Sequence, residues 1–442
     1  TIILSEPFYI FNEYVIIRYR CVLCLIFLCE SEGRTVMKKI CAVFIALLMI
    51  FTTGCSLSAG IDTLLYPPQL TDEQMAIKQA LIQNVGKDIN LKYPKSGTYR
   101  SAFVIADIDD EPTDEAIAFY QRTGIEYTEN NIRINILDQK DGKWTSVFDH
   151  AGSGTEIDKI MITNFSEDSK PDIVIGYSIL NQNDKIVQAY SYDDGQLKTI
   201  YTDNYAIMDT VDIDGDSINE HMLITGSSQD REPISRLIKK IDGVLSLISE
   251  TEMDPSVASY SSITKGYVTK DIPAIFVDTD KGDGTLQTQI IYAADGQMRN
   301  PIAKTPELMA KTTRPSGYLS MDIDSDGVVE IPTLSPFPGY ETADPTQRIY
   351  ITDWMAFEQY ALVKKNSGYY NINKGYCFML PSRWQGAVTV KPDTSSGDVV
   401  FYKYEGEIKP NMKELMRIST VKTENVSEKL TEGYQTVYTK GR

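Results

Sequence analysis

A short acidic pattern that recurs along the chain constrains its fold more than any other feature. The pattern is a nine-residue frame with oxygen-bearing side chains at positions one, three, five and nine, set between apolar runs. The frames that begin at Asp212 and Asp322 are complete, and a third begins at Asp107. Weaker versions begin at Asn164 and Asp278, the last with one inserted residue and no final acid. Self-similarity of this kind predicts a protein built from structural repeats.

The spacing of the frames indicates the architecture. Their first positions are 57, 48, 66 and 44 residues apart, about 54 on average. Each period contains enough short apolar or alternating runs for about four strands, and a unit of that size must stack on its neighbours to bury both faces. The expected fold is therefore mainly β: a β-propeller with five visible units, in a ring of five to seven blades.

Four Asp-Gly pairs lie between apolar runs and predict tight β-hairpins. Such hairpins need positive φ in the turn, which glycine adopts without steric cost. We therefore expect a hairpin around each pair, and these hairpins supply part of the strands in the repeats. The pairs are Asp141-Gly142, Asp194-Gly195, Asp242-Gly243 and Asp295-Gly296.

The acidic frames are candidate sites for a hard divalent cation. Ca²⁺ takes six to eight oxygen ligands, and acids at alternate positions of a turning loop converge on one point, which a backbone carbonyl at position seven and the acid at position nine can complete. An EF-hand is excluded, because position twelve is Leu223 or Thr333 and the flanks are strand-like. The alternative is a solvated acidic turn, but unneutralised acids at this spacing repel one another, which favours a cation.

The predicted structural Ca²⁺ ligands belong to three frames, and the frames at 164 and 278 are predicted to be ion-free turns. The ligands are Asp212, Asp214, Asp216, the carbonyl of Ile218 and Glu220; Asp322, Asp324, Asp326, the carbonyl of Val328 and Glu330; and Asp107, Asp109 and Glu115.

These repeats resemble FG-GAP/VCBS-type repeats, the blades of integrin-α-like propellers. The resemblance covers roughly residues 101–364 and is carried by the frames that begin at Asp212 and Asp322. It implies that each acidic loop joins two strands of a blade and binds Ca²⁺ through the matching positions. The stretch YPKSGTYRSAFVIADID (residues 93–109), together with the basic and apolar N-terminal segment that precedes Cys55, is also similar to uncharacterised lipoproteins of gut Firmicutes. That resemblance implies a location in the cell envelope.

The N-terminal region has the features of a bacterial export signal. Met37-Lys38-Lys39 is basic, residues 40–51 are apolar, and small residues precede Cys55 in a lipobox-like arrangement. This pattern predicts a signal peptide over 37–54 and a lipid on the thiol of Cys55, which would anchor the protein to the extracytoplasmic face of the membrane. An ordinary cleaved signal or a retained anchor are the alternatives. Residues 1–36 precede the first methionine and are predicted to be translated upstream DNA.

The remaining chain divides into three predicted parts. Residues 55–98 hold a tether and a helix, which Thr71 caps together with Gln74 and which Gly86 ends. The propeller repeats occupy 99–364, and a small β-rich domain occupies 366–442. Aromatic residues of that domain are either core or a sugar platform, and Cys377 among them is interpreted as a buried apolar residue rather than a nucleophile. The aromatics are Tyr376, Phe378, Trp384, Phe401 and Tyr404.

Charge and histidine content narrow the function. A net charge of −18 argues against nucleic acid, which binds through Lys and Arg. His150 and His221 are the only histidines, too few for most histidine-based catalytic sets. We expect a non-catalytic, calcium-stabilised binding, adhesion or scaffold protein at the cell surface, with an unknown protein or glycan ligand. The alternatives are a calcium-dependent extracellular polysaccharide-active enzyme and an accessory subunit of an envelope sensor or transporter.

Overall fold

The computed structural model describes residues 8–10, 14–19, 70–124, 131–165, 170–179, 185–213, 215, 221–226 and 233–438. The predicted signal peptide and Cys55 lie outside these residues. The chain divides into two compact units, Arg20–Met75 and the rest, and all six sheets belong to the second of these. In the part of the chain that is described, no helix has both the length and the hydrophobicity needed to cross a membrane.

Helix α3 (Asp72–Val85) begins and ends where the sequence predicts. The Gln74 amide donates to Thr71 Oγ1 at 3.2 Å, and the Thr71 amide donates to Gln74 Oε1 at 3.2 Å. This reciprocal pair is a capping box. Gly86 follows the helix with φ 93° and donates its N–H to the carbonyl of Ile82, so the predicted stop is also confirmed.

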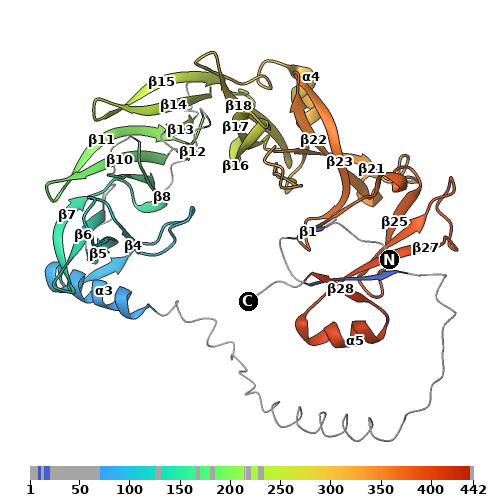
Figure 1. The fold of residues 1–442 in the computed structure, drawn as a ribbon, viewed down its shortest axis with the longest axis horizontal. Coiled ribbons are helices and arrows are strands. Elements are labelled where there is room, and N and C mark those ends of the chain that lie inside the picture. The colour runs from blue at the N-terminus through green and yellow to red at the C-terminus, as the bar shows by residue number, and fades with distance from the viewer. Residues whose placement is uncertain are drawn as a thin grey trace, which may run out of the picture. The chain divides into compact units, whose positions relative to one another are not determined.

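Six antiparallel sheets follow in chain order from α3, and the described fold is mainly β (Figure 1). The first sheet holds β3 (Ile89–Leu91), β4 (Phe103–Ala106), β5 (Glu115–Arg122), β6 (Ile132–Lys140) and β7 (Lys143–Ala151). The second holds β8 (Glu156–Thr163), β9 (Asp172–Ser178), β10 (Lys185–Asp193) and β11 (Gln196–Tyr205). The third holds β12 (Ile207–Val211), β13 (His221–Gly226), β14 (Ile234–Ile241) and β15 (Val244–Glu252).

The fourth to sixth sheets complete the described chain. The fourth holds β16 (Ser259–Thr269), β17 (Ile272–Asp280), β18 (Thr285–Ala294), β19 (Gln297–Arg299) and β20 (Arg314–Pro315). The fifth holds β21 (Ile331–Pro336), β22 (Tyr350–Glu358), β23 (Ala361–Asn371), β24 (Tyr376–Met379) and β1 (Phe8–Ile10). The sixth holds β25 (Val388–Pro392), β26 (Val399–Lys403), β27 (Glu414–Val421), β2 (Tyr14–Tyr19) and β28 (Gln435–Tyr438). Short helices lie between strands: α4 (Pro306–Thr312), α5 (Val426–Thr431), and 3-10 turns at Pro345–Gln347, Ser382–Trp384 and Thr423–Asn425.

The four predicted Asp-Gly hairpins are confirmed. They join β6 to β7, β10 to β11, β14 to β15, and β18 to β19, and in each turn the aspartate has φ near +50° and the glycine a larger positive φ. The corresponding turn of the fifth sheet joins β22 to β23 through Gln359 and Tyr360, whose φ values are 48° and 61°. Sequence reasoning missed this turn because it contains no glycine.

Successive sheets from the first to the fourth pack on one another with equivalent strands side by side. The first strands β8, β12 and β16 are neighbours, and so are the last strands β7, β11, β15 and β19. The apolar cores lie between successive sheets: one joins the first and second sheets, another the second and third, and a third the third and fourth. The repeats therefore stack in register, as units that cannot bury both faces alone must do.

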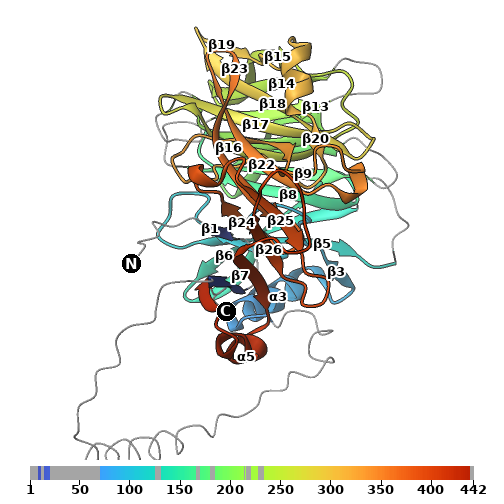
Figure 2. The ribbon, with the colours of Figure 1, turned by 90° about the vertical axis from the view of Figure 1, so that its right-hand side faces the viewer.

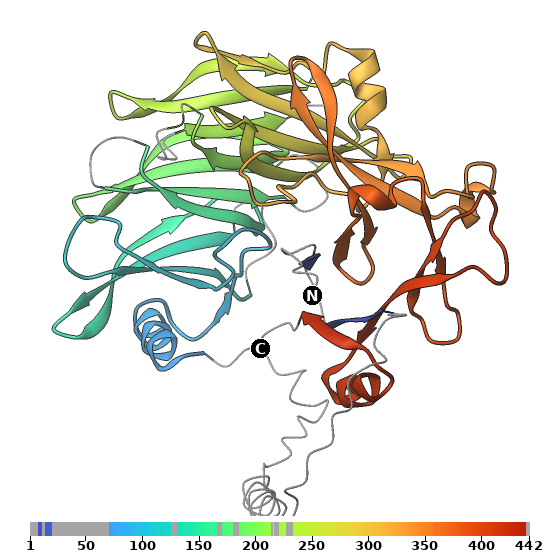
Figure 3. The same ribbon diagram turned by 45° about the vertical axis from the view of Figure 1, so that its right-hand side comes forward.

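Position two of each acidic frame, except the one at 278, fixes its loop to a core. The residues there are apolar and at most 5% exposed: Ile108, Phe165, Ile213 and Ile323. The fourth sheet has only a two-residue turn, Lys270-Asp271, between its first and second strands. Helix α4 contacts β18, β21 and β23 and places Leu308 in the core between the fourth and fifth sheets. Figure 3 shows this helix in gold beside those strands.

Two predicted domain boundaries are wrong. The first sheet begins before residue 99, because β3 pairs with β5. The boundary at 366 falls inside β23, which pairs with β22 on one side and β24 on the other, so the fifth sheet continues to Met379. The sixth sheet is not a separate body either, since Phe378 of β24 shares a core with Val390 of β25 (Figure 2).

That shared core also settles the role of the C-terminal aromatics. Tyr376, Phe378 and Phe401 are at most 3% exposed, and the ring of Trp384 lies 5.9 Å from those of both Phe378 and Phe401. Of the two alternatives, core packing is confirmed for these four residues, while Tyr404 is only partly buried and belongs to no core cluster of the described residues. Strand β1 pairs with β24, and β2 pairs with both β27 and β28. Both strands belong to residues 1–36, and the origin of that segment as translated upstream DNA stays a prediction.

Candidate metal centres

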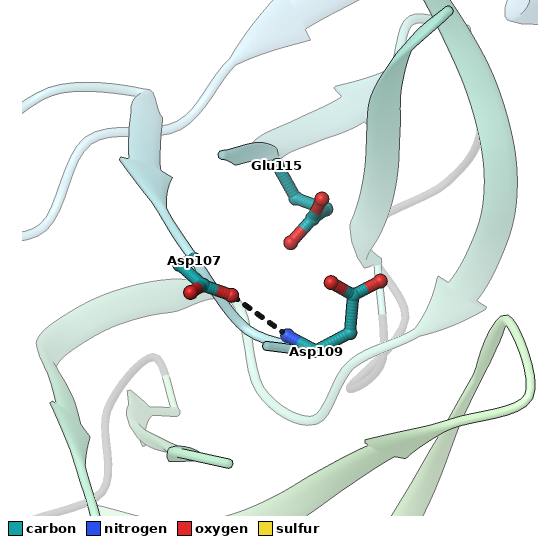
Figure 4. Close-up of side chains that lie close together, drawn as sticks. All are labelled: Asp107, Asp109 and Glu115. Carbon is teal, nitrogen blue, oxygen red and sulfur yellow. Dashed lines mark hydrogen bonds between the residues drawn. The ribbon is translucent and has the colours of Figure 1, made fainter. Parts of the chain in front are cut away.

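The loop of residues 107–115, which we call the 107 loop, joins β4 to β5 and gathers three carboxylates. One oxygen each from Asp107, Asp109 and Glu115 lies within 4.8 Å of the others. Figure 4 shows the carboxylates of Asp109 and Glu115 turned toward the same space, with Asp107 beside them. The amides of Asp109 and Asp110 donate to Asp107 Oδ1 at 3.2 and 2.8 Å, so the backbone fixes this side chain.

The loop of residues 322–330, the 322 loop, repeats this arrangement in front of β21. Its triad is Asp322, Asp324 and Glu330, again within 4.8 Å of one another. Asp326 is outside the triad and accepts a hydrogen bond from the Val328 amide at 2.9 Å. The amides of Asp326 and Gly327 donate to the two oxygens of Asp322. Positions one, three and nine are therefore brought together in both loops, while the Val328 carbonyl as a ligand stays a prediction.

The acid at position nine is the most distinctive member of each triad. Glu115 and Glu330 are each only 1% exposed, and each accepts a hydrogen bond at 3.1 Å from the amide of position two, Ile108 or Ile323. Burial raises the pKa of Glu115 to about 7, and repulsion from Asp109, Asp138 and Asp107 adds to the rise. Burial likewise raises the pKa of Glu330 to about 7, with repulsion from Asp324, Asp322 and Asp326.

These residues fit a calcium ion. Oxygens that bind one Ca²⁺ at 2.3–2.6 Å lie no more than about 5 Å apart, which the triads satisfy. Buried carboxylates that lack a positive partner are costly, and the Oδ1 atom of Asp324 is buried without any hydrogen-bond donor. A cation among the three acids would remove the repulsion and give Asp324 Oδ1 a partner. In each loop, the ligands that the structure describes for such an ion are three carboxylates.

The 212 loop, residues 212–220, is described only at its start. Asp214, Asp216, Ile218 and Glu220 lie outside the described residues. The Gly215 amide donates to Asp212 Oδ1 at 2.7 Å, as the Asp110 amide does to Asp107. Position four also has positive φ in all three loops, at Asp110, Gly215 and Ser325. The described part of the 212 loop thus follows the 107 loop, and its ligand set stays a prediction.

In the frame at 164, a lysine from another sheet faces the position-nine acid, at the place where the 107 and 322 loops offer room for a metal. Its position-nine acid, Asp172, is 1% exposed, and both of its oxygens lie 3.0 Å from the ammonium of Lys240. Lys240 comes from β14 of the third sheet and is itself mostly buried. A side-chain cation from the neighbouring sheet therefore neutralises this acid. Ser166 and Asp168 of the frame lie outside the described residues, and the ion-free turn stays a prediction.

The frame at 278 is not a repeat of the others. It begins inside β17, and its last acid lies just before β18. The other four frames instead end at the start of a strand, β5, β9, β13 or β21. Asp278 forms a fully buried ion pair with Arg314 at 2.7 Å. The same carboxylate accepts from the Ser320 amide and from Thr288 Oγ1. Asp278 is thus a structural residue. Four of the five predicted acidic frames remain as equivalent loops, those that begin at 107, 164, 212 and 322.

Three residues near these loops escaped sequence reasoning. Asp138 of β6 adds negative charge beside the 107 loop, Asn366 of β23 donates to Asp324, and Tyr267 of β16 pairs with the backbone of the 322 loop. Each lies on a strand remote in sequence from the loop it contacts. No local pattern of residues could have identified them.

Two cavities lie where the third sheet meets the fourth, and Pro273 contributes to both. The larger, of about 380 Å³, has an apolar lining that includes Ile213, Ile248 and Ile272, with Asp271 and Asp295 among its polar residues. The smaller, of about 290 Å³, is lined by residues that include Asp212, Lys265 and Tyr267. The short Lys270-Asp271 turn, which stands in place of an acidic loop, contributes Asp271 to the lining of the larger cavity.

Cys377 is unsuited to nucleophilic chemistry. The side chain is fully buried, and burial raises the pKa of its thiol to about 12. Its thiol contacts Met379 Sδ at 3.8 Å. A nucleophilic cysteine needs a lowered thiol pKa and access to solvent, so the interpretation of Cys377 as a packing residue is supported.

Comparison with known proteins adds little to this geometry. No protein-family model and no curated protein matches the sequence. Among solved structures the chain is similar to exotype rhamnogalacturonan lyase YesX, with a TM-score of 0.31 and 9% sequence identity over 80% of this chain and 75% of that chain. A likeness at that level carries no argument about activity.

Proposed function

We propose that the protein is a calcium-stabilised β-propeller that acts at the cell surface as a non-catalytic binding, adhesion or scaffold protein. The observation that carries the proposal is the shared construction of the 107 and 322 loops. In both, a buried glutamate with a raised pKa faces two aspartates and accepts a hydrogen bond from position two. Extracellular calcium modules use sites of this composition, with dissociation constants of about 10⁻⁴ to 10⁻³ M.

The stacking of the sheets supports the propeller. Five successive sheets have antiparallel strands in chain order, and in the first four of them equivalent strands of neighbouring sheets lie side by side. Radial repetition of such sheets protects their edges from pairing with other chains. The export signal and the lipid on Cys55 rest on the sequence and complete the proposal of a surface anchor.

The surroundings of the titratable residues favour binding over catalysis. The described position-nine acids face a proposed cation or, in the frame at 164, Lys240. In the frame at 278, Asp278 faces Arg314. His150 stacks on Phe148 at 5.9 Å and meets Tyr190 edge-on, and burial lowers its pKa. These groups are engaged in structure, which leaves them poorly placed as general acids or bases.

Calcium binding is directly measurable. In isothermal titration of the full chain with CaCl₂, we expect at least two sites, and a hundredfold excess over the dissociation constant should add about 2.7 kcal/mol of stability per site. Glu115→Gln and Glu330→Gln should each remove one site. Full binding stoichiometry in the double variant would contradict the assignment of the 107 and 322 loops.

We assign the ligand to the larger cavity. Its apolar lining includes Ile248 and Ile272, which are 41% and 36% exposed, and its volume lies in the range of small-molecule and side-chain pockets. Asp271 at this cavity favours a ligand that is apolar with a cationic group over an anionic one, while Asp295 is already paired with Arg299 at 3.0 Å.

A capture experiment tests the binding function. We expect immobilised full-length protein to retain ligand from glycan and peptide arrays, without turnover of host or plant polysaccharides in the presence of Ca²⁺. Ile272→Lys should abolish capture, because it places a positive charge in a cavity that favours a cationic ligand. Val363→Lys is the matched control, because Val363 has similar exposure (38%) on β23 and is not part of the cavity. Calcium-dependent polysaccharide cleavage would instead establish an enzyme.

A further inference from the structure

The two metal loops differ at position three. In the 322 loop, the Nδ2 group of Asn366 donates to Asp324 Oδ2 at 2.9 Å. Asn366 lies on β23, 42 residues away in sequence. In the 107 loop, the equivalent Asp109 accepts instead from the backbone amide of Glu111, inside the loop itself. Only the 322 loop thus has its third acid held by a side chain from another strand, among the hydrogen bonds of the described residues.

The hydrogen bond from Asn366 decides which way the Asp324 carboxylate faces. With Oδ2 held, Oδ1 is buried and has no donor. A buried polar atom left without a partner is destabilising, so this orientation is unfavourable unless something else satisfies the oxygen. Oδ1 belongs to the same carboxylate that approaches Asp322 and Glu330 within 4.8 Å. A cation among these acids is the partner that the geometry calls for.

The backbone of the 322 loop is fixed from a second direction. The Tyr267 amide donates to the Gly327 carbonyl at 2.9 Å, and the Val329 amide donates to the Tyr267 carbonyl at 3.0 Å. Tyr267 lies on β16 of the fourth sheet, so the loop is held between that strand and β23. The loop backbone is thereby placed independently of Asn366, which leaves Asn366 to act on the Asp324 side chain.

We propose that Asn366 is a positioning residue that orients Asp324 for the cation at the 322 loop. This inference rests on the proposed function, because it requires that the loop bind Ca²⁺. Residues that hydrogen-bond to metal ligands typically contribute 10–100-fold to metal affinity. Asn366→Ala should therefore weaken Ca²⁺ binding at the 322 loop about tenfold and leave the 107 loop unchanged.

The test is calorimetric titration of the full chain with CaCl₂, with the 107 loop silenced by Glu115→Gln and the 212 loop by Asp212→Asn, so that only the 322 loop is observed. Asn366→Ala and Asn366→Val are compared in this background. Valine also lacks the donor but favours a strand, so it keeps the test valid if the alanine variant folds poorly. Asn366→Gln retains an amide donor and should recover part of the affinity. A second titration, in the Glu330→Gln background, should show that the 107 loop binds equally well with and without Asn366.

The outcomes separate the inference from the proposed function. A tenfold loss confined to the 322 loop supports the positioning role. If the unsubstituted chain binds Ca²⁺ and the Asn366 variants bind it equally well, Asn366 has no such role, although the metal site stands. A purely structural role would lower the melting temperature in chelator without changing the affinity, and that result also overturns the inference. Absence of binding to the unsubstituted chain overturns both.

Discussion

Replacing Lys240 with methionine should lower the free energy of unfolding by about 3–5 kcal/mol, and added calcium should not restore it. The ammonium of Lys240 lies 3.0 Å from both oxygens of Asp172, and both side chains are mostly or fully buried. Removal of Lys240 takes away the ammonium that faces the buried Asp172 carboxylate, and loss of one member of a buried ion pair is strongly destabilising. The frame at 164 offers no described acid triad that could recruit a metal in place of the lysine.

Urea unfolding measures this effect, with CaCl₂ and with chelator. The double substitution Lys240→Met and Asp172→Asn should recover much of the loss, because it removes the buried negative charge along with the lysine. Lys198→Met is the matched control: Lys198 is an exposed lysine on a strand, and its loss should change stability by less than about 0.5 kcal/mol. Rescue of Lys240→Met by calcium would show that the frame at 164 binds a metal after all.

The contrast between Lys240 and the metal loops shows how far the sequence could be used for prediction. The sequence predicted the acidic turns, their apolar anchors and the hairpins, since each depends on neighbouring residues: Asp141-Gly142 needs only its own φ angles. What neutralises each acid depends on the neighbouring strands. Lys240 is 68 residues from Asp172, and Arg314 is 36 from Asp278. The spacing of acids is the same whether a metal, a lysine or an arginine faces them.

Two failures have the same physical origin. The frame at 278 has the expected composition, yet it follows the second strand of its sheet, and acid spacing carries no information about strand order. The boundary at 366 was inferred from a change to aromatic composition. That change reflects a new core between the fifth and sixth sheets, around Phe378 and Phe401, rather than the start of a separate body.

In the absence of divalent cations, the protein should become less stable as the pH rises from about 4.5 to about 7. Burial and the surrounding aspartates raise the pKa of both Glu115 and Glu330 from 4.5 to about 7 in the folded state. Between these values the folded protein holds protons that the unfolded chain has released. Stability therefore falls with rising pH, by an amount on the order of 3 kcal/mol for each glutamate once both are ionised.

Thermal unfolding between pH 5 and pH 8 in EDTA measures this slope. A saturating concentration of CaCl₂ should remove it, because the ion binds the ionised carboxylates and stabilises the folded state most at the higher pH. The Glu115→Gln and Glu330→Gln double variant should lose the slope without calcium, since neither site then carries a titrating acid at position nine. Stability in EDTA that is constant or rises over this range would mean that the two glutamates are ionised without a cation, and the main argument for metal in these loops would be lost.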